Sequence, residues 1–170
     1  GRPVGDQMVT AVTLSNLGSA SRGLGEYDAA VRYYHESLPI MQELGELRWV
    51  AANHNGLGLT YLELGNYSQA VVQLKQGFDT AVSIQAIPDA LTALTHLGRY
   101  AAARQQVESA ARWLIFVVNH TITPAISRQE AEAALNQLGE TLTPLQKTNA
   151  RAAAQALSLT KIALEIRELV

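Results

Sequence analysis

Histidines carry the first patterns in this chain that could support metal chemistry. His35-Glu36 begins like the H-E-x-x-H motif of zinc proteases, but Pro39 stands where the second zinc-binding histidine is required. No partner histidine or carboxylate lies at a ligand spacing from the other three histidines, which are His54, His96 and His120. We therefore expect His35 on a helix surface and His54 as a hydrogen-bonded helix residue, with contact to a ligand as the alternative for His54. The histidines predict no catalytic residue and no metal site.

Glycine pairs are the second candidate, for binding phosphates. Gly23-Leu24-Gly25 and Gly56-Leu57-Gly58 lack the third glycine and the preceding strand of a dinucleotide-binding loop. The phosphate-binding pattern G-x-x-x-x-G-K-S/T is absent, so these residues do not form an ATPase by themselves. We interpret both pairs as packing and helix-capping glycines, and we expect no cofactor.

Composition narrows the class of partner. With 170 residues, 48% hydrophobic and 16% charged, the chain should fold rather than remain disordered. A net charge of −2 and scattered basic residues argue against direct nucleic-acid binding and against an anionic membrane as partner. There is no cysteine, no signal-peptide pattern and no apolar run long enough to cross a bilayer. We expect a cytoplasmic segment of a longer protein.

One short pattern occurs three times. LGEYDAA at residues 24–30 returns as LGNYSQA at 64–70 and as LGRYAAA at 97–103, at intervals of 40 and 33 residues. A glycine after a helix can adopt the left-handed conformation that ends it, and apolar residues at i, i+3, i+4 and i+7 follow each copy. The pattern predicts a turn between two antiparallel helices at each glycine, with a tyrosine in the first turn of the second helix. The glycines are Gly25, Gly65 and Gly98, and the tyrosines are Tyr27, Tyr67 and Tyr100.

Helix, tight turn and helix at this period resemble a tetratricopeptide repeat array over roughly residues 6–118. The resemblance rests on Gly18, Gly25, Tyr27, Ala30 and Tyr34, on Gly58, Tyr61, Gly65, Tyr67 and Ala70, and on Gly98, Tyr100, Ala103 and Ala110. It implies an all-α, tetratricopeptide-like α-solenoid of antiparallel helix pairs. We place three pairs at about 6–44, 46–85 and 88–118 in a domain of residues 1–118, followed by a C-terminal helical cap at 119–170 that packs on the last repeat.

Three helices are expected in this cap, at about 127–138, 144–156 and 159–169. Ser127 with Glu130 predicts a capping box, and Thr143-Pro144 predicts a cap with proline at the first helical position. The stretches 99–104 and 157–164 resemble the last repeat and the closing helix of bacterial STAND-class ATPase regulators, which include LuxR- and SARP-type transcription regulators. This resemblance implies the sensor arm of such a protein.

The predicted binding surface is the groove lined by the first helix of each pair, which suits an extended peptide or a partner helix. Its candidate residues are Ser15, Ser19, Arg22, Asn55, Leu59, Leu62, Glu63, Thr92, Thr95 and His96. Arg22, Asn55 and Glu63 are the expected polar anchors. The expected partner is a protein or peptide, including other domains of the same parent chain.

Two packing expectations accompany this assignment. Gly58 should meet Ala70 where the helices of the second pair cross, and Pro39 should bend the helix from Tyr27 to Leu44 because it cannot donate to the carbonyl of His35.

The leading function is a non-catalytic interaction module in a signalling or transcription regulator. A stand-alone adaptor or chaperone-like assembly protein is the alternative, and an enzyme is the weakest of the three.

Overall fold

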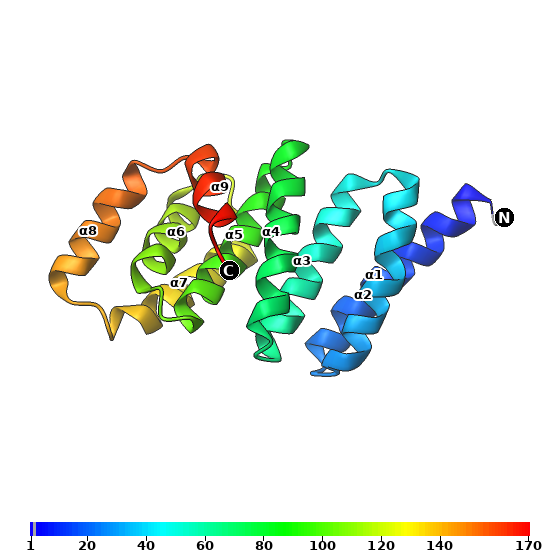
Figure 1. The fold of residues 1–170 in the computed structure, drawn as a ribbon, viewed down its shortest axis with the longest axis horizontal. Coiled ribbons are helices and arrows are strands. Elements are labelled where there is room, and N and C mark those ends of the chain that lie inside the picture. The colour runs from blue at the N-terminus through cyan, green and yellow to red at the C-terminus, as the bar shows by residue number, and fades with distance from the viewer. Residues whose placement is uncertain (2) are drawn as a thin grey trace. The chain divides into compact units, whose positions relative to one another are not determined.

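The computed structural model describes residue 1 and residues 3–170, and within them the regular structure is entirely α-helical (Figure 1). Contacts divide the chain into two compact units, Gly1–Ala86 and Ile87–Val170. The first unit holds α1 (Val4–Gly23), α2 (Tyr27–Leu44), α3 (Leu47–Glu63) and α4 (Tyr67–Ser83). The second holds α5 (Ile87–Ala103), α6 (Val107–Asn119), α7 (Ala125–Gly139), α8 (Pro144–Gln155) and α9 (Leu159–Arg167). The predicted all-α class is confirmed, and none of the described helices has the length and apolarity needed to cross a membrane.

Left-handed glycines follow the first three helices of the first unit. Gly25 (φ 78°) separates α1 from α2, Gly45 (φ 71°) separates α2 from α3, and Gly65 (φ 73°) separates α3 from α4. After each glycine, the next backbone N–H donates to a carbonyl five residues back, as from Asn66 to Tyr61 at 2.8 Å. The turns predicted at Gly25 and Gly65 are therefore confirmed, as are the expected second-helix starts at 27 and 67.

The turn predicted at Gly98 is wrong. Gly98 lies inside α5, and Tyr100 lies in the last turn of that helix rather than in the first turn of α6. The chain turns instead at Gln105, which adopts the left-handed conformation (φ 60°) without being a glycine. The predicted position failed because the true turn lacks its glycine signal, while Leu97-Gly98-Arg99-Tyr100 imitates that signal about two helical turns too early.

The repeat in the structure has one constant period. Gly25, Gly65 and Gln105 occupy equivalent turns spaced by 40 residues, and a second series of glycines with the same spacing lies inside the first helices. A Cβ added to these glycines would lie 3.0 Å from the Tyr34 ring at Gly18, 2.6 Å from Leu74 Cδ2 at Gly58 and 2.6 Å from Leu114 Cδ2 at Gly98. Gly98 is thus the helix-crossing glycine of the third pair and not its turn.

The expected contact between Gly58 and Ala70 needs a related correction. The atoms nearest to Gly58 belong to Leu74, one helical turn beyond Ala70, and they include the Leu74 backbone nitrogen at 3.0 Å. Ala70 is itself fully buried in α4. The small residue is therefore correctly placed at the crossing, but the residue it accommodates is a leucine.

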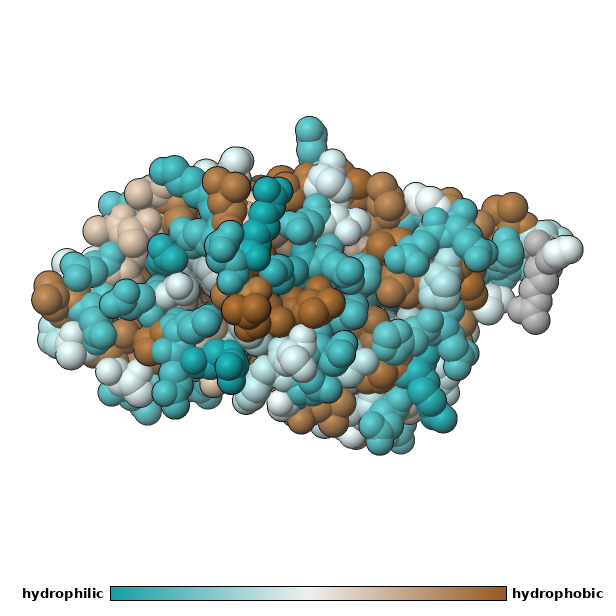
Figure 2. Space-filling model, viewed as in Figure 1, coloured by the Kyte–Doolittle hydropathy of each residue, from teal (hydrophilic) through white to brown (hydrophobic). Residues whose placement is uncertain are grey.

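Two apolar clusters hold the first unit together. One contains Ala11, Met41 and Val50, and the other contains Ala30, Tyr34 and Leu57. Helix α2 takes part in both and runs through Pro39 without interruption, so the bend expected there stays a prediction. On the face drawn in Figure 2, apolar residues at the surface of each unit stand among hydrophilic ones.

The last three helices pack on the third pair within the second unit. Helix α7 contacts both α5 and α6, and α8 contacts α6. The α9 carboxylate of Glu165 accepts a hydrogen bond from Trp113 Nε1 at 2.8 Å and lies 3.0 Å from Arg112 Nη2. The three predicted helices are therefore present, within a few residues of their expected bounds, and α9 contacts Trp113 of this pair. The predicted domain boundary at residue 118 stays a prediction.

The connection between α6 and α7 is closed by hydrogen bonds. The Arg128 guanidinium donates to the carbonyl oxygen of Val118 and, at 2.9 Å, to that of His120, while Thr123 Oγ1 donates to Val117 at 2.6 Å. These donors satisfy carbonyls that the end of α6 leaves open.

The predicted helix starts had mixed outcomes. Ser127 is not a cap, because α7 begins at Ala125 and the Ser127 side chain is buried. The predicted cap at Thr143 is confirmed, as part of a capping box with Gln146.

Replacing Gly58 with alanine should destabilise the first unit by about 1–3 kcal/mol, because the new methyl group overlaps Leu74 and its backbone. Gly23→Ala is the matched control, since a Cβ at Gly23 meets nothing within 4 Å. Urea denaturation of both variants measures the difference. Equal stability of the two variants would contradict the close crossing.

Gln105→Gly should stabilise the second unit by about 0.5–1 kcal/mol, because glycine removes the steric cost of the left-handed turn and part of that gain is lost to unfolded-state entropy. Gln105→Ala, which keeps the Cβ, should give no such gain. The test is the melting temperature of each variant compared with that of the parent chain, and no rise for Gln105→Gly would contradict the prediction.

Candidate partner-binding surface

Arg22 and Glu63 meet where the first helices of the first unit end. Arg22 Nη1 of α1 lies 3.5 Å from Glu63 Oε1 of α3, and their side chains are 29% and 23% exposed. Two of the three predicted anchors therefore share one surface and form an ion pair with each other. Ser19 is exposed on the same helix as Arg22, with its Oγ 2.8 Å from the Tyr34 hydroxyl, and Leu62 next to Glu63 is half-buried.

The other predicted groove residues of the first unit are buried. Ser15 is 5% exposed, Asn55 7% and Leu59 4%. The Asn55 amide lies against Gly77 of α4, where any Cβ would overlap its Oδ1. Asn55 therefore belongs to the packing between α3 and α4, and the surface open to a partner centres on Arg22 and Glu63.

A buried polar network explains why Ser15 points inward. Ser15 Oγ lies 2.9 Å from Ser37 Oγ and donates to Asn53 Oδ1 at 2.7 Å. Asn53 Nδ2 donates to Ser37 Oγ at 2.9 Å, and Ser37 Oγ lies 2.8 Å from the Ala11 carbonyl oxygen, to which it donates. Buried polar groups that satisfy each other fix the relative positions of their helices, so this network ties α1, α2 and α3 together. This network was not predicted from the sequence, although Ser15, Ser37 and Asn53 lie among the apolar residues of their helices.

In the second unit, helix α7 occupies the predicted surface. Thr92 Oγ1 lies 2.9 Å from Ser127 Oγ, and His96 Nε2 lies 3.4 Å from Glu130 Oε2. Thr95 is fully buried and donates to the Leu91 carbonyl at 2.9 Å. These three candidates therefore serve contacts within the unit.

His54 is buried, whereas His35 is exposed. His54 is 6% exposed, and its Nδ1–H donates to Gln73 Oε1 at 2.8 Å. Burial lowers the pKa of His54 below the 6.5 of a free imidazole, and the nearby His35 adds to this while the Gln73 hydrogen bond opposes it. His35 is exposed, with its Nε2 3.1 Å from the Tyr61 hydroxyl. Both placements predicted from the sequence are confirmed.

Comparison with protein families agrees with this geometry over the first unit. Residues 9–81, which run from α1 into α4, match the tetratricopeptide repeat family. No curated protein matches the chain. Residues 9–81 are therefore similar to tetratricopeptide repeats, a class of repeat that mediates protein–protein interaction.

Lowering the pH should destabilise the folded chain in part through the buried His54. The unfolded chain binds a proton at His54 more readily than the folded chain because the folded pKa is lowered, so this residue's contribution to stability is complete above pH 6.5 and declines as the pH falls below it. His54→Gln should reduce the loss of melting temperature between pH 7.5 and about pH 5. His35→Gln, at an exposed position, should leave that loss nearly unchanged. Identical pH profiles for His54→Gln and the parent chain would contradict the assignment.

Proposed function

We propose that this chain is the sensor arm of a larger bacterial regulator of the STAND class, and that it binds a protein segment through the surface around Arg22 and Glu63. The observation that carries the binding part is the partly exposed ion pair between two first helices of tetratricopeptide repeats. The resemblance of the closing helices to those regulators supports the choice of parent protein.

The chemistry of the pair suits an extended peptide. Arg22 can donate to peptide carbonyl oxygens and Glu63 can accept from peptide N–H groups, so together they can satisfy both backbone groups of a bound segment. Each side chain already restrains the other at 3.5 Å, which lowers the entropy lost when a partner binds. Leu62 and the exposed Ser19 flank the pair and add apolar and hydrogen-bonding surface.

The test is affinity for the remainder of the parent protein, measured by calorimetry with Arg22→Ala/Glu63→Ala. The double variant should bind at least about tenfold more weakly, since hydrogen bonds to charged groups contribute about 1.5–3 kcal/mol each. Asp28→Ala/Arg32→Ala is the matched control, because it also removes one acid and one base, from exposed positions on α2. Loss of binding in the control but not in the Arg22/Glu63 variant would reject the proposed surface.

The parent protein is tested separately by the full-length coding sequence. A G-x-x-x-x-G-K-S/T segment outside these residues supports the ATPase regulator. Its absence supports a stand-alone adaptor that uses the same binding surface.

A further inference from the structure

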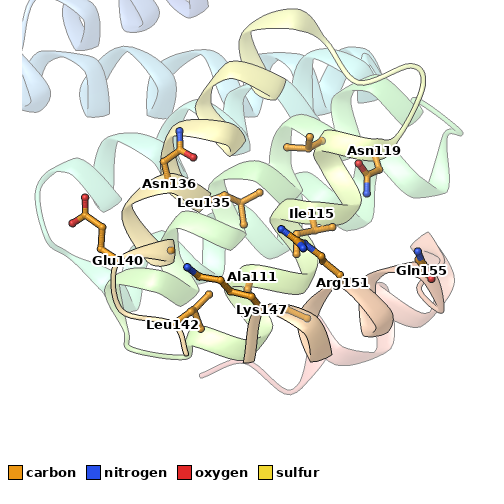
Figure 3. A pocket seen from close by; sticks show the side chains of 13 residues that line it. Ala111, Ile115, Asn119, Leu135, Asn136, Glu140, Leu142, Lys147, Arg151 and Gln155 are labelled. Carbon is orange, nitrogen blue, oxygen red and sulfur yellow. The ribbon is translucent and has the colours of Figure 1, made fainter. Parts of the chain in front are cut away.

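A cavity of about 630 Å³ lies inside the second unit, between α6, α7 and α8 (Figure 3). Its volume is within the range of pockets that bind small organic ligands. Helices α7 and α8 both pack on α6, and the cavity is the space that remains between them. It is separate from the Arg22–Glu63 surface, which lies in the first unit.

The floor of the cavity is apolar. Ile115 and Val118 of α6, Leu135 of α7 and Leu142 of the following loop contribute the larger side chains, and Ala111 with Ala150 line the contact of α6 with α8. Such a surface favours the burial of a hydrocarbon or aromatic group, at about 25 cal/mol per Å².

Two cations stand on one wall of this apolar space. Lys147 and Arg151 are four residues apart, so they share one face of α8, and Figure 3 shows both side chains reaching over the cavity. The Lys147 chain crosses towards the end of α7, where its Cε would lie 4.0 Å from a Cβ on Gly139. Within residue 1 and residues 3–170, neither cation makes a hydrogen bond or an ion pair.

The charges around the cavity are unbalanced. Glu140 is the one acidic residue among those that line it, and Figure 3 shows its carboxylate directed away from the Lys147 ammonium. The other polar side chains are uncharged amides, from Asn119, Asn136 and Gln155. The cavity therefore combines an apolar floor with a net positive wall.

We propose that this cavity binds a small amphipathic anion, with the apolar body of the ligand on the floor and a carboxylate or phosphate group between Lys147 and Arg151. Charge complementarity selects the anion, because a neutral ligand of the same shape leaves both cations without a partner. The amides at the margin can donate to the remaining oxygens of the anionic group. The lining of this ligand site belongs to the second unit, whereas the proposed protein-binding residues Arg22 and Glu63 belong to the first.

The probe ligand is octanoate, and its binding to the whole chain is measured by ¹H–¹⁵N chemical-shift titration. Saturable shifts should concentrate in α6, α7 and α8, and 1-octanol should bind at least about tenfold more weakly because it lacks the charge. Raising the salt concentration should weaken octanoate binding but not octanol binding. Equal affinity for the two molecules, or shifts spread evenly over both units, would overturn the proposal.

Matched variants separate charge from packing. Lys147→Gln/Arg151→Gln should weaken octanoate binding at least about tenfold and leave octanol binding unchanged. Arg32→Gln/Arg99→Gln removes the same net charge from positions outside the cavity and should bind octanoate like the parent chain.

A third variant tests the floor. Ile115→Trp narrows the cavity from a half-buried position and should weaken both ligands together. Melting temperatures of all variants establish that they fold. An unaltered octanoate affinity in the Lys147/Arg151 variant rejects the cavity as an anion site.

Discussion

The close crossing of paired helices at a glycine is the constraint on which the rest of this structure depends. At Gly58 and Gly98 the second helix approaches so closely that a leucine side chain lies where a Cβ would be, and at Gly18 a tyrosine ring takes that place. One residue in each pair must therefore lack a side chain, and this glycine recurs at a constant spacing of 40 residues. The left-handed turns at Gly25, Gly65 and Gln105 recur with the same spacing.

Local signals made the first two pairs predictable, and the loss of one signal misplaced the third. Gly25 and Gly65 mark their turns because glycine tolerates a positive φ, whereas Gln105 adopts a positive φ at the equivalent turn without being a glycine. The same type of backbone bond closes all three turns, here from Gln106 to Ala101 at 2.8 Å. A left-handed turn without a glycine has no local signal in the sequence. Gly98 was visible in the sequence, but its role was distinguishable only by its distance from Gly58.

The site was predictable in part for the same reason. Helical periodicity placed Arg22 and Glu63 on one surface, because that requires only the phase of each helix. It did not indicate that Asn55 packs against Gly77 or that α7 contacts Thr92 and His96, since both facts depend on neighbouring helices. The cavity was missed because α8 is rich in alanine and its docking on α6 has no distinct sequence pattern.

The two walls of the cavity differ in how firmly they are held. Helix α7 is fixed at its start by Arg128, which closes the carbonyl end of α6, and by the bond between Ser127 and Thr92. Ala150 and Ala154 are the buried residues of α8, which packs on α6 and lies between two short connections. Because these side-chain hydrogen bonds hold the start of α7 and the buried residues of α8 are alanines, we expect an occupant of the cavity to shift α8 more than α7. This shift would move Lys147 and Arg151 as well, so the positions of the two charges that select the ligand would differ between the empty and the occupied cavity.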